Sequence, residues 1–187
     1  SFGRPASIDA RGRPVADVEV SRPKPGLHDF ATALGPRIPV PSALCLFRTD
    51  LVRRIGGFDP RFRYAEDYDF YLRNLRHGGP AWRHGAVVAE YRRHGSNASH
   101  RRAACLRDVI ALLAAQEPAI AGDSDLVAAW RRGRRDWQRH FGQLIPREVF
   151  DALRTGRITA AARALATFAA HAPGTLEGLA DLRARLP

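Results

Sequence analysis

The chain contains no methionine, a single lysine at Lys24 and only two cysteines among its 187 residues. Because a natural translation product begins with methionine, we expect this chain, which starts at Ser1, to be a piece of a longer protein rather than a processed one. No uninterrupted apolar run approaches the roughly 20 residues that cross a bilayer, and no secretory signal opens the sequence. The hydrophobic fraction of 45% and the charged fraction of 26% are ordinary for a globular protein, so disorder is not expected.

The two cysteines lie in apolar surroundings, at Cys45 and Cys105. Free cysteines of this kind are usually buried and reduced. A zinc site needs more ligands at closer spacing, so we predict two buried thiols and no zinc.

The formal net charge of +11 raises the question of nucleic-acid binding. The basic residues are almost all arginines, however, and they occur throughout an alanine-rich sequence, as a GC-rich genome would encode. Without a clustered basic motif, we predict no specific nucleic-acid partner.

The first hundred residues alternate short apolar stretches with turn residues. Residues 9–12 predict a turn between two short strands, and residues 43–47 predict a short buried strand. A helical turn follows, which Thr49 or Asp50 can cap and which Gly56-Gly57 ends.

A longer helix is expected to start near Glu66-Asp67 and to end at Gly78-Gly79-Pro80. Two strands are then predicted, at 81–83 and 86–91. The loop after them contains Arg92, Arg93 and His94.

From about residue 100 the sequence becomes rich in alanine, leucine and arginine. Helical spacing is present at 101–116, 124–141, 147–154, 158–171 and 175–185. We therefore predict an α/β domain at 1–100 and a helical C-terminal region at 101–187. The segment 146–171 is amphipathic and basic, which is compatible with peripheral contact with a membrane or with packing on a neighbouring helix. Packing is favoured because most of its apolar residues are alanines, which insert weakly into lipid.

Two adjacent carboxylates, Glu66 and Asp67, occur at the predicted start of a helix. Free backbone N–H groups and the positive end of the helix dipole stabilise an ionised carboxylate there. Such a carboxylate can accept a proton from an incoming hydroxyl, although acidic residues at helix starts are also common as simple caps.

The context of this pair resembles the bacterial family-two glycosyltransferases with the GT-A fold. The resemblance is carried by an ordered series of motifs: Arg48, Gly56-Gly57-Phe58-Asp59, Glu66-Asp67-Tyr68-Asp69 with Leu72-Arg73, and Tyr91-Arg92-Arg93-His94. It covers residues 40–100 closely and residues 1–39 loosely. The resemblance implies an α/β fold that is the acceptor-side half of a GT-A domain, followed by the helical region.

The resemblance also implies roles for individual residues. Asp67 matches the catalytic base, Glu66 matches a carboxylate that helps to hold the acceptor, and Gly57 with Phe58 matches the turn that forms the acceptor wall, which Asp59 is expected to stabilise. His94, Arg93 and Arg92 match a loop that contacts a divalent metal, Mn²⁺ or Mg²⁺, or the diphosphate. For Asp69 and Arg73 we expect a packing ion pair, because they do not share a helical face with Asp67.

The nucleotide-binding half of such an enzyme, with its Asp-x-Asp-like metal motif, is not found in this sequence. Asp123-Ser124-Asp125 has the letters of that motif but opens a helix, so we interpret it as a cap. The expected partners are a nucleotide-sugar donor and a glycan or lipid-linked acceptor, in the cytoplasm or at the inner face of the membrane. The alternative is a non-catalytic binding module.

Overall fold

The computed structural model describes residues 1–15, 25–35, 41–93, 101–172 and 174, which belong to two compact units. The first unit comprises Ser1–Ala33, Ile38–Pro60 and Glu66–Asn97; the second comprises Leu34–Arg37, Arg61–Ala65 and Ala98–Pro187. The described part combines a small sheet with several helices, which confirms the mixed α/β class.

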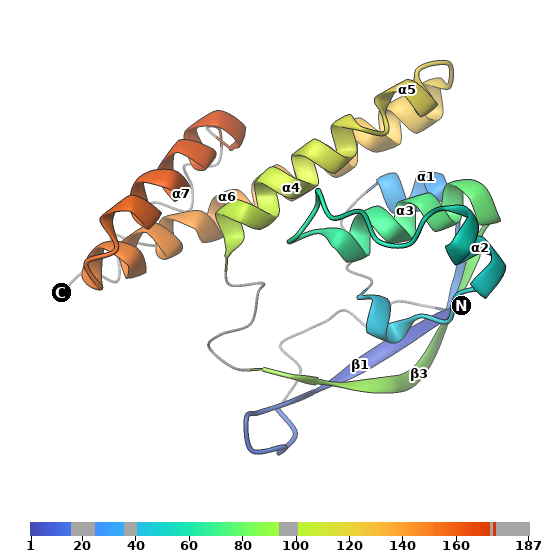
Figure 1. Cartoon of the computed structure of the whole chain (residues 1–187), viewed down its shortest axis with the longest axis horizontal. Coiled ribbons are helices and arrows are strands. Elements are labelled where there is room, and N and C mark those ends of the chain that lie inside the picture. Colours follow the sequence, from blue (N-terminus) through green and yellow to red (C-terminus); the bar gives the residue numbers. More distant parts are fainter. Residues whose placement is uncertain (16–24, 36–40, 94–100, 173, 175–187) are drawn as a thin grey trace. The chain divides into compact units, whose positions relative to one another are not determined.

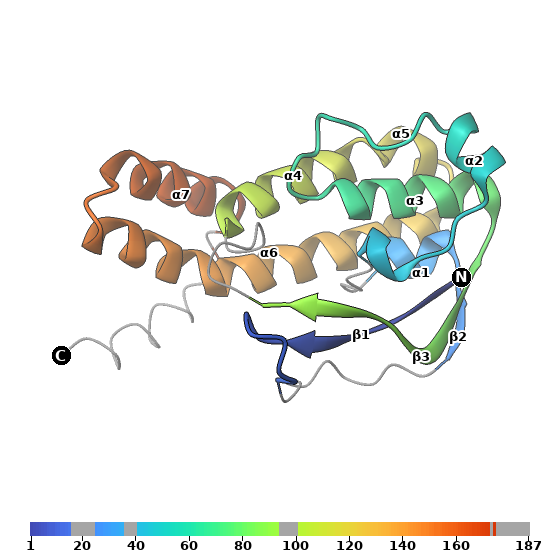
Figure 2. The same cartoon turned by 60° about the horizontal axis from the view of Figure 1, so that its bottom comes forward.

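In the described part of the first unit, three strands form a sheet in the order β1-β3-β2 (Figure 2). The strands are β1 (Phe2–Ile8), β2 (Gly26–His28) and β3 (Ala81–Arg92). The central strand β3 pairs parallel with β1 and antiparallel with β2. The prediction of two separate strands at 81–83 and 86–91 was therefore wrong. The strand continues through Gly85 because β1 pairs along its length and absorbs the irregularity as register shifts near Arg4.

The turn predicted after the first strand is confirmed. The Asp9 carboxylate accepts hydrogen bonds from the backbone N–H groups of Arg11 at 2.8 Å and Arg13 at 2.9 Å. Gly12 adopts a φ of 81°, which a residue without Cβ tolerates. The strand expected after this turn lies mostly outside the described residues.

The strand predicted at 43–47 was wrong. A 3-10 helix, η1 (Ser42–Leu44), covers the first two residues of this stretch, and Cys45 forms only an isolated antiparallel bridge with Phe2. The apolar run does not act as one buried element, because Leu44 is buried whereas Leu46 is 79% exposed. A short apolar run specifies burial of some of its residues but not the backbone form.

Helix α2 (Thr49–Arg54) ends as predicted at Gly56 and Gly57, whose φ values are 78° and 70°. Its N-cap is Arg48, and no side chain caps it. The prediction that Thr49 or Asp50 caps it was wrong, since the Asp50 carboxylate accepts instead from the Arg48 guanidinium at 2.8 Å.

Helix α3 (Glu66–Gly78) lies over the sheet of the first unit and has the predicted bounds (Figure 2). The ring of Tyr71 on α3 makes an edge contact with that of Phe2 on β1, with centroids 5.6 Å apart. The helix ends where Gly79 turns to a φ of 80°. A short helix, α1 (Phe30–Leu34), receives the Tyr68 hydroxyl, which donates to the Ala33 carbonyl oxygen at 2.8 Å.

The second unit is helical in its described part: α4 (Arg102–Ala114), α5 (Glu117–Ile120), α6 (Ser124–Arg154) and α7 (Ile158–His171) (Figure 1). Asp123 caps α6 as expected, since its carboxylate accepts from the N–H groups of Asp125 and Leu126. Cys105 is buried, as predicted, whereas Cys45 in the first unit is only partly buried; neither forms a disulfide. The expected helix at 175–185 lies outside the described residues.

The prediction of separate helices at 124–141 and 147–154 was wrong, because α6 continues through Pro146. A proline inside a helix costs about 3 kcal/mol. Here Phe141, Ile145 and Pro146 are all buried, so the packing of the helix on its neighbours within the unit outweighs that cost. No helix of the described chain is long and apolar enough to cross a membrane.

Candidate functional site

The first turn of α3 carries the carboxylates that the sequence singles out. Glu66 and Asp67 are partly exposed, whereas Asp69 is buried. Two residues apart on a helix, Asp67 and Asp69 point to different faces. In this turn the side chain of Asp67 is therefore accessible to solvent, whereas that of Asp69 is buried within the first unit.

Asp69 and Arg73 form the ion pair that the sequence predicts. The Arg73 Nε donates to Asp69 Oδ2 at 2.9 Å, and only 3% of the Asp69 side chain and 16% of the Arg73 side chain are exposed. The Arg73 Nη2 donates to the same oxygen, so two donors converge on one carboxylate oxygen in a pair that is well shielded from solvent screening.

Arg73 also holds the turn that follows α2. Its Nη1 donates to the Ile55 carbonyl oxygen and its Nη2 to the Gly57 carbonyl oxygen, both at 2.8 Å. The planar guanidinium can serve the carboxylate and both carbonyls at once because its five N–H groups are fixed in a fork. These two bonds could not be predicted from the sequence, because every residue has a backbone carbonyl and no residue type marks the ones that accept.

Phe58, expected on the acceptor wall, lies beside this clasp. Its ring packs on that of Phe70 with centroids 4.5 Å apart, while 51% of the residue remains exposed. Phe47 contacts Phe70 from another direction at 4.8 Å. An exposed aromatic ring fixed by a buried one is the kind of surface on which a sugar ring can stack.

Cys45 is close enough to Asp67 for the two groups to interact electrostatically. Burial raises the pKa of the Cys45 thiol from 9.0 to about 11; the N-terminal ammonium of Ser1 opposes this shift, and the Asp67 carboxylate adds to it. The structure thus places Asp67 near the chain segment that bridges to the start of β1. From the sequence, Cys45 was expected only to be a buried thiol, with no relation to Asp67.

A buried polar cluster around Phe2 was not predicted. The ring of His28 contacts that of Phe2 at 5.1 Å, and the Arg83 guanidinium lies 5.6 Å from the Phe2 ring centroid. Burial, with the charge of Arg83, lowers the pKa of His28, and burial raises the pKa of Tyr71. A lone histidine in a segment without a motif gave no signal of this environment.

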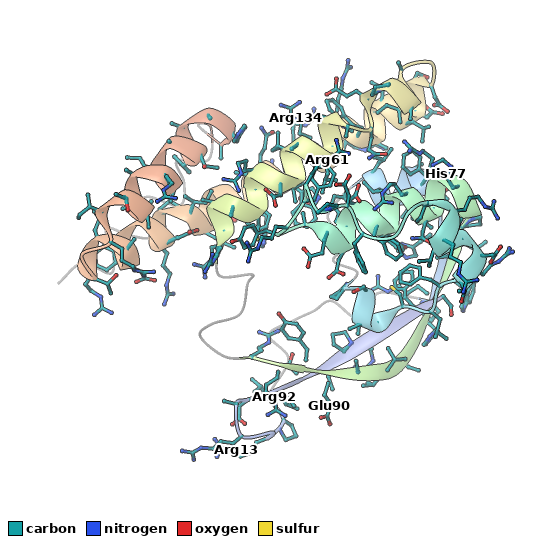
Figure 3. The ribbon with its side chains drawn as sticks, in the orientation of Figure 1. Arg13, Arg61, His77, Glu90, Arg92 and Arg134 are labelled. Carbon is teal, nitrogen blue, oxygen red and sulfur yellow. The ribbon has the colours of Figure 1, made fainter. Side chains whose placement is uncertain are left out.

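Of the three residues expected at the diphosphate, Arg92 is the last residue of β3, and Arg93 and His94 come directly after it in the sequence. Figures 1 and 2 show that α3 begins at the same end of the first unit at which β3 ends. Arg92 lies beside the turn after β1 (Figure 3), and its Nη1 is 3.2 Å from the carbonyl oxygens of Asp9 and Ala10. Arg93 has an exposed side chain, and its backbone N–H donates to Ile8. His94 lies outside the described residues.

The described residues do not supply a metal site of their own. Among them, no group of three or more histidine, cysteine, aspartate or glutamate side chains lies close enough to hold a metal ion. The part of the chain that the structure describes therefore does not by itself assemble a ligand set for the expected Mn²⁺ or Mg²⁺.

Comparison with protein-family models, with curated proteins and with solved structures found no match for this chain.

Proposed function

We propose that this chain is the acceptor-side part of an inverting, nucleotide-sugar-dependent glycosyltransferase, a partial GT-A domain in which Asp67 is the general base. The observation that carries the proposal is the organisation of α3. Its first turn presents Asp67 near the surface, while Arg73 two turns later clasps the Gly56-Gly57 turn next to Phe58.

The proposed reaction is a single displacement at the anomeric carbon of the donor sugar. An acceptor hydroxyl loses its proton to Asp67 as its oxygen forms the new bond to that carbon. The bond between the carbon and the diphosphate oxygen breaks with its electron pair, and the nucleoside diphosphate leaves. General-base assistance of this kind contributes roughly 10²–10⁴-fold to the rate.

Other residues take supporting roles in the proposal. Glu66 helps to hold the acceptor, and Phe58 offers its ring face to the acceptor sugar. Arg92, Arg93 and His94 belong to the loop that would meet the leaving diphosphate, where arginine forks suit phosphate oxygens.

The surface of the sheet supports the idea that more protein packs on this unit. Val87 and Val88 on β3 lie at the register irregularity opposite Arg4 and Pro5, and each is 46% exposed. Trp82 on the same strand is 50% exposed. A strand that leaves three large apolar side chains open to solvent is what a nucleotide-binding half, packed against it, would cover.

The test is Asp67→Asn in a protein that joins this chain to its expected nucleotide-binding half, with transfer from labelled nucleotide sugars as the readout. The matched control is Asp125→Asn, because Asp125 is also the second residue of a helix and lies in the second unit. The proposal predicts a loss of kcat of about 10²-fold or more for Asp67→Asn only. Equal turnover in both variants would refute it and favour a non-catalytic binding module.

A further inference from the structure

The exposed large apolar side chains of the second unit are concentrated in one hairpin. Among its described residues, those that stand open to solvent are Phe150 (39%), Leu153 (50%), Ile158 (60%) and Leu165 (56%). They lie on the end of α6 and on α7, on either side of the turn that joins the two helices (Figure 1). In the rest of the described unit the large aliphatic side chains are buried or partly buried.

Helix α7 has two apolar faces. It packs within the unit through Ala161, Ala164 and Phe168, which are buried, so the packing predicted for this segment is confirmed. A second stripe, Ile158, Ala162, Leu165 and Ala169, follows the spacing i, i+4, i+7, i+11, and all four residues are exposed. This spacing places them on one side of the helix, so α7 keeps an apolar stripe that no described element covers.

The charge around this stripe is of one sign. From Ala152 to Ala172 the sequence has no carboxylate, while Arg154, Arg157 and Arg163 are exposed. The contacts of the last two are polar but neutral: Arg157 Nε donates to the Thr155 hydroxyl, and Arg163 Nε donates to the Thr159 carbonyl oxygen. From Phe150 to Ala169 the hairpin therefore carries three arginines against one carboxylate, Asp151, which lies 4.0 Å from Arg147.

We propose that this hairpin docks on an anionic lipid surface, with Ile158 and Leu165 in the acyl boundary and the three arginines at the headgroups. Apolar insertion combined with basic flanking residues is the pattern of helices that lie in a membrane interface. The docking does not depend on the proposed transfer reaction.

Two other partners fit the same residues less well. A nucleic acid would engage the arginines but would leave the apolar stripe in water. A two-fold contact between copies of this chain would bury the stripe, but it would bring the arginines of one copy against those of the other. Of these three partners, the anionic lipid surface satisfies both features together.

The experiment is flotation of the chain with vesicles of phosphatidylcholine alone and of phosphatidylcholine with an equal part of phosphatidylglycerol. We expect binding to the anionic vesicles and little to the neutral ones. The double variant Ile158→Gln with Leu165→Gln should weaken binding by about tenfold or more, because glutamine does not gain the free energy that an apolar side chain gains on transfer from water into the lipid. The matched control, Leu27→Gln with Leu46→Gln, removes two exposed leucines from the first unit and should bind like the wild type.

Arginine removal tests the electrostatic part. Replacing Arg154, Arg157 and Arg163 by glutamine should weaken binding to the anionic vesicles by about fivefold per residue. Hydrogen exchange of the α7 amides in the wild type should slow with anionic vesicles, which reports docking without any substitution.

The proposal is overturned if the wild type does not float with anionic vesicles, or if the Ile158/Leu165 variant floats as well as the wild type. It is also overturned if light scattering shows a dimer that the same variant dissociates, which would assign the stripe to a second copy.

Discussion

The buried pair of Asp69 and Arg73 makes a sharp prediction about stability. Arg73→Met removes the cationic partner that the described residues provide for the Asp69 carboxylate, whose side chain is 3% exposed. Breaking a buried ion pair by removing one member costs about 3–5 kcal/mol, because the other charge stays buried without its partner. The carbonyl oxygens of Ile55 and Gly57 also lose their donor, so we expect the upper part of that range.

The effect of Asp69→Asn on the stability of the first unit should have opposite signs in the wild type and in the Arg73→Met variant. In the wild type it should destabilise the first unit, because it weakens the pair with Arg73. In the Arg73→Met background it should stabilise the unit by about 1–3 kcal/mol, because it removes an uncompensated buried charge. Arg73→Lys should lie between the extremes, since a single ammonium keeps the charge but cannot reproduce the fork.

The assay must report on the first unit alone. Hydrogen exchange of the α3 amides, followed by mass spectrometry at increasing urea concentration, gives the free energy of opening for that helix. A cost of less than about 1 kcal/mol for Arg73→Met, or equal destabilisation of α3 by Asp69→Asn in both backgrounds, would show that the two residues do not form a stabilising pair.

Two further predictions concern titrating groups of the first unit. A thiol pKa raised from 9.0 to about 11 makes native Cys45 slow to alkylate at pH 8 relative to the unfolded chain. Asp67→Asn should speed this reaction, whereas Asp125→Asn should not. Equal alkylation rates in the two variants would show that the Asp67 charge does not act on the Cys45 thiol. Burial lowers the pKa of His28 below 6.5 in the native protein. As the pH drops from about 6.5, His28 is therefore protonated in the unfolded chain before it is protonated in the native protein. The free energy of unfolding should fall over this range, down to the lower native pKa. His28→Gln should flatten this pH dependence, measured by urea-dependent hydrogen exchange of α3, whereas the control His77→Gln, at an exposed residue, should keep it. The same pH dependence in the wild type and both variants would contradict the assignment of the effect to His28.

Local chemistry made several elements predictable. The bounds of α3 follow from carboxylates at its start and from Gly78-Gly79-Pro80 at its end, because free N–H groups and a required positive φ act within a few residues. Asp123 was recognised as a cap, and the Asp69–Arg73 pair follows from i,i+4 spacing, for the same reason.

The errors arose where distant contacts outweigh local signals. Pro146 predicts the end of a helix, yet α6 continues through it because the residues around it are buried. Gly85 reads as a break between strands, yet β1 pairs across it. The apolar run around Cys45 became a 3-10 helix with one bridge.

The sequence by itself determined the mixed α/β class, the helix limits set by glycine and proline, and the position of Asp67 in a first helical turn. Only the tertiary structure decided that Arg73 clasps the Gly56-Gly57 turn, that Cys45 lies near Asp67, and that Ile158 and Leu165 stay exposed on α7. The division has a physical reason. Caps, turns and i,i+4 pairs depend on neighbours a few residues away, whereas burial and long-range hydrogen bonds depend on which parts of the chain pack together.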